Sequence, residues 1–310
     1  MTKTASSDNI ALAISAVLAS VLALSLGDAL IKAFSVQFSL SQLFVLRSML
    51  VLALLWILGR ATRQGLSINV GSAGWIVLRS VLLVTMWVAY YIALQRVPLS
   101  TAAAVFYTLP LFICLLAAIF LKEPIRKLGW VAIGIGFVGM LIIVRPETSG
   151  FNAYVLLPLI SAICYAGAMV ITRAHCQQCN PLGLSMALHL AFVLIGLLIT
   201  LFSFADILPE SVKSQHKFLF GQWSALTSGT SALMLALAGL IMIGSIGSAM
   251  AYQRAPASLV SIFDYGYLIG GVLWGFVFFH EIPDTATVIG MTFITLAGVV
   301  VIRYGQGEGN

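Results

Sequence analysis

Residues 95–145 read QRVPLSTAAAVFYTLPLFICLLAAIFLKEPIRKLGWVAIGIGFVGMLIIVR, and residues 253–303 read QRAPASLVSIFDYGYLIGGVLWGFVFFHEIPDTATVIGMTFITLAGVVVIR. The two stretches share residues at a constant offset of 158. The recurring residues are Gln95, Arg96, Pro98, Ser100, Tyr107, Leu115, Phe120, Glu123 and Arg145, matched by Gln253, Arg254, Pro256, Ser258, Tyr265, Leu273, Phe278, Glu281 and Arg303. Many secondary transporters consist of duplicated apolar halves that bind substrate between them near the bilayer midplane. The duplication therefore predicts a transporter.

The composition is typical of a protein that is embedded in lipid. The chain is 61% hydrophobic and 8% charged, whereas about 25% of the residues of an ordinary soluble domain are charged. Such a chain could not keep a soluble fold solvated, so we predict an integral membrane protein surrounded by the lipid bilayer. The net charge of +6 is spread over short loops without a dense basic tract, so we expect no nucleic-acid partner.

The lengths of the apolar segments predict an all-α integral membrane fold with ten transmembrane helices. About twenty apolar residues are needed to cross the hydrocarbon core. The segments that meet this length are 10–32, 40–59, 75–95, 98–121, 128–145, 152–173, 181–202, 231–252, 257–280 and 285–303.

The repeat divides these helices into two sets of five. We expect a first five-helix repeat at 10–147 and a second at 152–303, with tails at 1–9 and 304–310. Because five is odd, the second copy enters the membrane from the opposite side and the repeats have inverted topology. Lys and Arg in the short loops number nine on one side and five on the other. This bias predicts that both termini are cytoplasmic.

Three sequence features resemble the EamA-type unit of the drug/metabolite transporter superfamily. In each copy a proline opens the first helix, a glutamate closes it and a glycine-containing helix follows, and FVLRSML at 44–50 resembles that family's second helix. The resemblance covers essentially the whole chain. It implies a ten-helix transporter of the bacterial cytoplasmic membrane, with a central cavity lined mainly by helices one, three, four, six, eight and nine. One departure is that Pro124 directly follows Glu123, whereas Ile282 separates Glu281 from its proline.

Small residues in the fifth segment predict close helix packing. Gly129, Gly134, Gly136 and Gly139 lie in one segment, and small residues allow helices to approach closely in lipid. We interpret them as structural residues.

Four charged residues fall inside apolar segments, where a charge is unfavourable unless it faces a partner or water. Asp28 and Arg79 lie nearer segment ends, so we interpret them as structural residues that reach toward the headgroups. Arg47 is interpreted as an interhelical tether. Asp264 differs because its repeat counterpart is Phe106, which favours a site for a substrate cation or a coupling proton. The alternative for Asp264 is a static ion pair with Arg47 or Arg79.

Aromatic residues accompany Asp264 and complete the predicted binding site. An aromatic cage with one carboxylate suits an amine through cation–π contacts, and a zwitterion also fits if Arg47 or His189 reaches the cavity. We assign Tyr252 and Tyr90 to interfacial aromatic belts. The predicted substrate-binding residues are Asp264, Tyr265, Trp87, Tyr91, Tyr107, Phe106, Tyr165, Arg47 and His189.

Enzyme motifs are absent from the sequence. It contains no Gly-x-Ser-x-Gly, no His-Glu-x-x-His and no glycine-rich phosphate loop, so we expect neither an enzyme nor a cofactor. Cys176 and Cys179 lack a second Cys or His pair at ligand spacing, so we expect two reduced thiols and no metal. We predict a secondary active transporter that exports or exchanges small amphiphilic metabolites, either amino acids or amines. The alternatives are a passive facilitator or channel, an organic-anion transporter that uses Arg47, or a membrane-embedded sensor.

Overall fold

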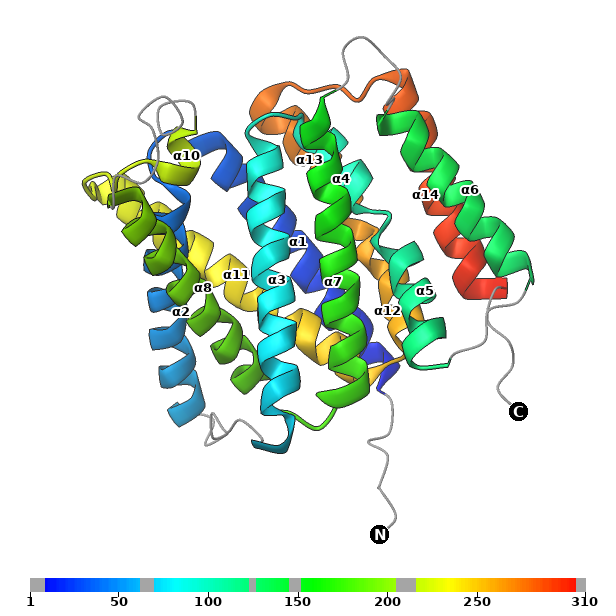
Figure 1. Cartoon of the computed structure of the whole chain (residues 1–310), viewed down its shortest axis with the longest axis horizontal. Coiled ribbons are helices and arrows are strands. Elements are labelled where there is room, and N and C mark those ends of the chain that lie inside the picture. The colour runs from blue at the N-terminus through cyan, green and yellow to red at the C-terminus, as the bar shows by residue number, and fades with distance from the viewer. Residues whose placement is uncertain (1–8, 62–69, 123–126, 145–151, 205–215, 305–310) are drawn as a thin grey trace.

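The computed structural model describes residues 9–61, 70–122, 127–144, 152–204 and 216–304 (Figure 1). The repeat residues Glu123 and Arg145 and nearly all of both predicted tails lie outside the described residues. Every regular element in the described part is helical, which agrees with the all-α prediction. The helices are α1 (Ile10–Phe34), α2 (Leu40–Ala61), η1 (Val70–Ser72), α3 (Ala73–Leu94), α4 (Leu99–Phe106), α5 (Leu109–Phe120), α6 (Lys127–Val144), η2 (Ala153–Val155), α7 (Leu156–His175), α8 (Pro181–Phe204), α10 (Lys217–Phe220), α11 (Ser228–Arg254), α12 (Ala257–Asp264), α13 (Gly266–Phe279) and α14 (Thr285–Tyr304).

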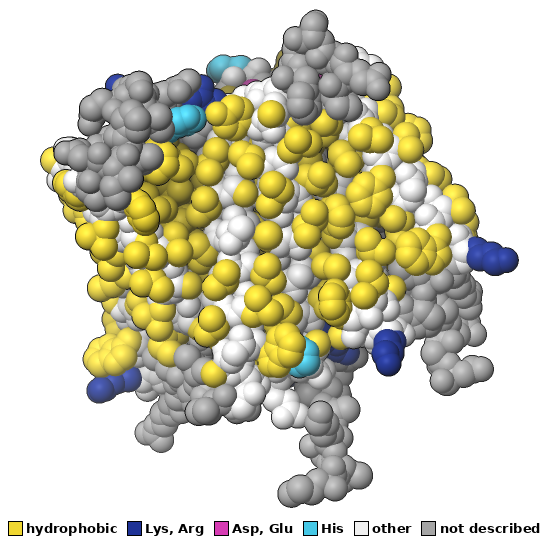
Figure 2. Space-filling view, in the orientation of Figure 1, with side chains coloured by type: hydrophobic (Ala, Val, Ile, Leu, Met, Phe, Trp, Pro, Cys, Tyr) yellow, Lys and Arg dark blue, Asp and Glu magenta, His cyan; other side chains and the backbone are white. Residues whose placement is uncertain are grey.

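The described residues contain nine helical segments long and apolar enough to cross a membrane. The fourth combines α4 with α5, and the ninth combines α12 with α13. The tenth predicted segment corresponds to α14, whose apolar part Thr285–Ala297 is shorter. Hydrophobic side chains cover most of the face in Figure 2, with Lys and Arg near its edges. Since a bilayer would solvate such a surface, the chain is an integral membrane protein.

The sequence predicts continuous helices at 98–121 and 257–280, but in the structure each is interrupted near its middle. In the first copy α4 ends at Phe106 and α5 begins at Leu109. Pro110 explains this break, because proline has no N–H to donate to the Phe106 carbonyl and its ring clashes with that turn. In the second copy α12 ends at Asp264, the repeat counterpart of Phe106, and α13 begins at Gly266. The two interruptions therefore fall at equivalent positions.

A left-handed residue follows each interrupted helix at equivalent positions. Lys122 has φ 57° and its repeat counterpart His280 has φ 52°. These are the only non-glycine residues with positive φ in the described ranges. The two copies therefore end this helix with the same kind of turn.

The helices pack in four main pairs: α1 with α11, α2 with α8, α3 with α7, and α6 with α14. If each of the first five spans is exchanged with its counterpart among the last five, the α1–α11 pair becomes the α7–α3 pair. The α2–α8 and α6–α14 pairs are then unchanged. The α6–α14 pair lies at one end of the molecule (Figure 1). There a Cβ at Gly139 would come within 2.8 Å of the Gly290 carbonyl oxygen, and a Cβ at Gly136 would overlap Leu111. The packing role predicted for these two glycines is confirmed, whereas Gly134 has no atom within 4 Å of its added Cβ.

Candidate functional site

Two buried carboxylates lie at the centre of the helix bundle, each hydrogen-bonded to a tyrosine from another helix. Asp28 is on α1 and Asp264 is the last residue of α12, and each is 2% exposed. The Tyr267 hydroxyl donates to Asp28, and the Tyr252 hydroxyl donates to Asp264. The Tyr267 hydroxyl also lies 3.1 Å from the Tyr90 hydroxyl. Within the described ranges neither acid has a cationic partner within 4.0 Å.

Both carboxylates line one cavity of about 20 Å³. This volume holds about one water molecule, so the cavity is too small for a metabolite in this conformation. Helices from both halves of the chain contribute to its wall. The lining residues are Val21, Leu24, Asp28, Met86, Trp87, Tyr90, Phe106, Tyr107, Leu109, Tyr165, Asp264 and Tyr267.

Phe106 is at the centre of the aromatic wall. Its ring centroid lies 5.2 Å from that of Tyr90, 5.5 Å from Tyr107, 5.9 Å from Tyr165 and 6.2 Å from Tyr267. Such separations are typical of attractive aromatic pairs. The interruption after α4 thus places a ring against the cavity where the equivalent interruption after α12 places a carboxylate.

A second cavity of about 10 Å³ shares Asp28 and Trp87 with the first and reaches Arg47 on α2. Arg47 is 1% exposed, and its Nη1 donates to the Tyr91 hydroxyl at 3.1 Å. Its guanidinium also lies 5.3 Å from the Phe192 ring centroid. Among the described residues nothing hydrogen-bonds to the Arg47 Nε or Nη2. The second cavity therefore contains a buried cation with unused donors.

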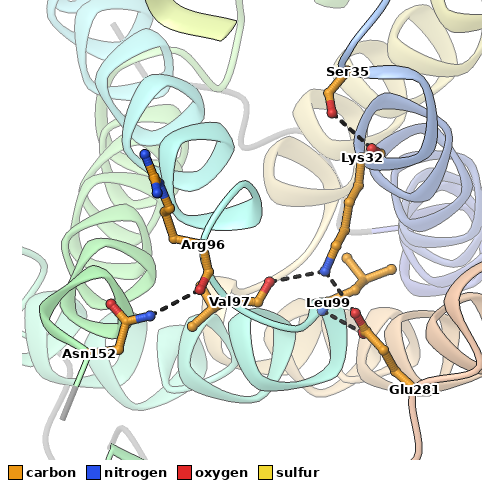
Figure 3. Close-up of polar contacts among 7 residues, drawn as sticks. All are labelled: Lys32, Ser35, Arg96, Val97, Leu99, Asn152 and Glu281. Carbon is orange, nitrogen blue, oxygen red and sulfur yellow. Dashed lines mark hydrogen bonds and ion pairs between the residues drawn. The ribbon is translucent and has the colours of Figure 1, made fainter. Parts of the chain in front are cut away.

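A polar cluster joins the two halves of the chain at the end of the bundle where α1 finishes (Figure 3). The Lys32 ammonium lies 2.9 Å from one oxygen of Glu281 and donates to the Val97 carbonyl at 3.0 Å. The other Glu281 oxygen accepts from the Leu99 N–H at 2.7 Å. Leu99 is the first residue of α4, so a carboxylate there also complements the helix dipole. We call Lys32, Glu281 and the Leu99 N–H the latch.

A wide hollow of about 1040 Å³ includes Ser35 and Arg96, which lie beside the latch. Lys217 contributes a second positive charge to its wall.

Most of the predicted site residues line the two cavities. Asp264, Phe106, Tyr107 and Tyr165 line the first, Arg47 and Tyr91 line the second, and Trp87 lines both. The other two are placed differently. The buried Tyr265 hydroxyl donates to the Ile294 carbonyl on α14 at 3.0 Å, and His189 Nδ1 lies 3.2 Å from the Ser48 hydroxyl. Seven of the nine predicted residues thus line the two cavities, and their role in binding stays a prediction.

Comparison with known proteins identifies the family. Residues 10–145 match the EamA-like transporter family. The pseudopaline exporter of Pseudomonas aeruginosa is 25% identical over 94% of this chain and 98% of its own length. The riboflavin transporter of Vibrio cholerae is 27% identical over 91% and 90%, and the S-adenosylmethionine uptake transporter of Rickettsia prowazekii is 25% identical over 73% and 70%. The chain belongs to the drug/metabolite transporter superfamily.

The fold of this drug/metabolite transporter also matches a solved crystal structure. The two align with a TM-score of 0.66 over 97% of this chain and 98% of the other, at 18% identity. At that identity the likeness concerns the fold alone. The names of the relatives and of the family are those of transporters rather than enzymes.

Four residues of this transporter differ from the sequence interpretation. Asp28 and Arg79 were expected to reach toward the headgroups, but both are buried, and the Arg79 Nε donates to the Thr172 hydroxyl at 2.7 Å. Tyr90 and Tyr252 were assigned to interfacial belts, yet both are buried and hydrogen-bonded in the central cluster. The alternative of an Asp264 ion pair with either arginine is wrong within the described residues. The interpretation failed because depth was judged from position along each segment.

The Cys176–Cys179 loop of the transporter is held by a glutamine. The Gln253 side-chain amide donates to the carbonyls of Cys176 and Cys179 at 2.7 and 2.8 Å. Both thiols are buried and free, and burial raises the pKa of the Cys176 thiol to about 12. A thiol that stays protonated near neutral pH is a poor nucleophile and metal ligand.

Proposed function

We propose that this chain is a secondary active transporter that exports or exchanges small amphiphilic metabolites, either amino acids or amines, by alternating access. The observation that carries the proposal is Asp264, a buried carboxylate whose hydrogen-bond donor is Tyr252 and which faces the central cavity without a cationic partner within the described residues. A carboxylate inside a membrane is unfavourable unless it meets a cation, a proton or water, so such residues mark substrate and ion sites. The ammonium group of a substrate, or a coupling proton, supplies the missing positive charge.

The walls of the cavity support a substrate that combines a cation with an apolar body. Trp87, Phe106, Tyr107 and Tyr165 present rings to the cavity, and ring faces attract ammonium groups through cation–π contacts. The relatives are named for chemically different cargoes and include both an exporter and an uptake transporter. Because the shared frame serves different cargoes, the substrate must be argued from the cavity residues of this chain.

Two five-helix halves of inverted topology, at 10–147 and 152–303, supply the moving parts in this proposal. Three observations support them: the matched interruptions, the matched left-handed turns at Lys122 and His280, and the exchange pattern of the four helix pairs. Rocking of such halves opens a central site to each side in turn. We place the protein in the bacterial cytoplasmic membrane with both termini in the cytoplasm.

The test is transport by purified protein in liposomes, with Asp264→Asn compared with Asp284→Asn. Asp284 is exposed and its side chain accepts from the Thr287 N–H at 2.8 Å, a role that asparagine also performs. We expect saturable, trans-stimulated and pH-dependent flux of an amino acid or amine in wild type and in Asp284→Asn, and none in Asp264→Asn.

Other outcomes would contradict the proposal. If Asp264→Asn transports at the wild-type rate with the wild-type pH dependence, the role proposed for Asp264 is wrong. Flux without saturation or trans-stimulation would indicate a channel or passive facilitator. Anion flux that survives Asp264→Asn would indicate the organic-anion alternative.

A further inference from the structure

The Arg47 guanidinium has unused donors on one edge. Its Nη1 donates to Tyr91, whereas Nε and Nη2 have no partner among the described residues. Leaving a charged donor buried and unpaired is strongly unfavourable. The Nε–Nη2 edge presents two parallel N–H groups, and this arrangement binds the two oxygens of a carboxylate.

The surroundings of Arg47 neutralise its charge only in part. Ring centroids of Phe44, Tyr91 and Phe192 lie 5.9, 5.9 and 5.3 Å from the guanidinium carbon. Such cation–π contacts stabilise a cation less than a bidentate carboxylate does. Asp28 lines the same cavity but lies beyond 4.0 Å, and its carboxylate accepts from Tyr267 instead. Within the described residues the guanidinium therefore lacks a close anionic partner, although the cavity of about 10 Å³ must widen to admit one.

The cavity beside Arg47 continues the proposed cation site. Asp28 and Trp87 line both cavities, so a molecule that spans them has Asp264 near one end and Arg47 near the other. An anion alone would leave two buried carboxylates without a positive charge, and an amine alone would leave the Arg47 edge unfilled. A molecule with both charges satisfies both ends.

We propose that Arg47 is the carboxylate-binding residue of the transport site, so that the substrate is a zwitterion with an ammonium group at Asp264 and a carboxylate at the Nε–Nη2 edge. This inference rests on the proposed function, because it adds a second pole to the same site. His189 borders the anionic pole: its Nε2 is also buried without a partner in the described part of the chain, and its ring packs 5.6 Å from that of Phe192. Asp28, between the two poles, serves as the fixed counter-charge of Arg47 when the site is empty.

The test uses ligand sets that differ by one charge. The probes are phenylalanine, phenethylamine and 3-phenylpropionate, and in parallel tryptophan, tryptamine and indole-3-propionate. Thermal stabilisation of the detergent-purified full chain reports binding. In wild type we expect at least one amino acid to bind roughly tenfold or more tightly than both of its partners, since only the zwitterion makes charge-assisted bonds at both poles.

Arg47→Gln, Arg47→Lys and Arg79→Gln separate this proposal from a structural role. Arg47→Gln should bind the amine as wild type does and lose the preference for the amino acid, whereas Arg47→Lys should retain part of it. Arg79 is equally buried but lines neither cavity, so Arg79→Gln should keep the full preference. If Arg47→Gln does not fold, Arg47→Lys decides, because a lysine loses the bidentate edge and must weaken the preference.

Three results would overturn the carboxylate assignment: equal binding of amine and amino acid by wild type, an unchanged preference in the Arg47 variants, or no response to either set. Failure of the proposed function looks different, because amine binding would then persist in Asp264→Asn whatever happens at Arg47.

Discussion

The latch connects α1 and α4 of the first half to the end of α13 in the second, so breaking it should open that end of the bundle (Figure 3). Glu281→Ala removes both contacts of the carboxylate. The bond to the Leu99 N–H has the geometry of a helix cap, which contributes about 1 kcal/mol. The ion pair is only 15% and 20% exposed at its two side chains and contributes up to about 1 kcal/mol.

The sum sets the expected magnitude. Losing about 2 kcal/mol of closed-state stabilisation raises the open population roughly thirtyfold, since about 1.4 kcal/mol corresponds to a factor of ten. Glu281→Gln keeps an acceptor for the Leu99 N–H but loses the ion pair with Lys32. Lys32→Met likewise removes the ion pair and leaves the Glu281 acceptor in place. Each should raise the open population only about fivefold.

Labelling of a buried cysteine measures this opening. Ser100 is 3% exposed in the first turn of α4, so Ser100→Cys in a background without the four native cysteines reports access from the latch side. A membrane-impermeant maleimide should label Ser100→Cys roughly thirtyfold faster when Glu281→Ala is added. Labelling rates within twofold of one another in all the latch variants would refute the gating argument and leave Glu281 a role in folding alone.

The remaining predictions concern packing, the buried acid and the loop thiol. Gly139→Ala should lower the free energy of unfolding by about 1–3 kcal/mol because its Cβ meets the α14 backbone. Gly134→Ala has no such contact and should raise that free energy by up to about 1 kcal/mol. Thermal unfolding in detergent measures both, and equal effects would contradict the packing argument. Tyr252→Phe removes the hydrogen-bond donor to Asp264 and should lower the free energy of unfolding by about 1–3 kcal/mol. The loss should be smaller when Asp264→Asn is already present. Additive losses in this double-mutant cycle would exclude the contact. The pKa of Cys176 is raised to about 12, so this thiol should react slowly with iodoacetamide at pH 8. Its rate should rise about tenfold for each unit by which the pH increases toward that pKa, because the thiolate is the reactive form. Rapid labelling of the folded protein at pH 8 would show that the thiol is not buried.

The sequence sufficed to predict the membrane class and the family, because each rests on a local or periodic signal, and the same kind of signal singled out Asp264 as a candidate site residue. Apolar length predicts a span wherever it occurs in the chain, and the missing counterpart of Asp264 is visible by aligning the two copies. The interruption after α4 also had a signal, Pro110, which a search for helix-breaking residues would have found. The break before Gly266 has no comparably strong signal.

Asp28 could not be assigned from the sequence because its role depends on tertiary partners. Asp28 lies six residues before Phe34, the last residue of α1. This is less than two helical turns from the helix end, a position that resembles the membrane edge. Its burial results from Tyr267, a residue 239 positions away in the chain. The same applies to Tyr252, whose hydroxyl meets Asp264 only because the chain reverses direction between α11 and α12. Hydrogen bonds between distant segments leave no periodic trace.

The cavity wall relates the duplication to the chemistry of the site. Phe106 and Asp264 occupy equivalent positions in the two copies, and so do Leu109 and Tyr267, yet all four line the same cavity. In the proposed inverted-repeat arrangement, counterparts from the two copies meet in this way near the axis that relates them. At both positions the second copy carries the polar residue and the first an apolar one. The repeat thus supplies a nearly symmetric frame, and the departures from it supply the acid and the hydroxyl, so substitutions at these four positions should change the substrate rather than the fold.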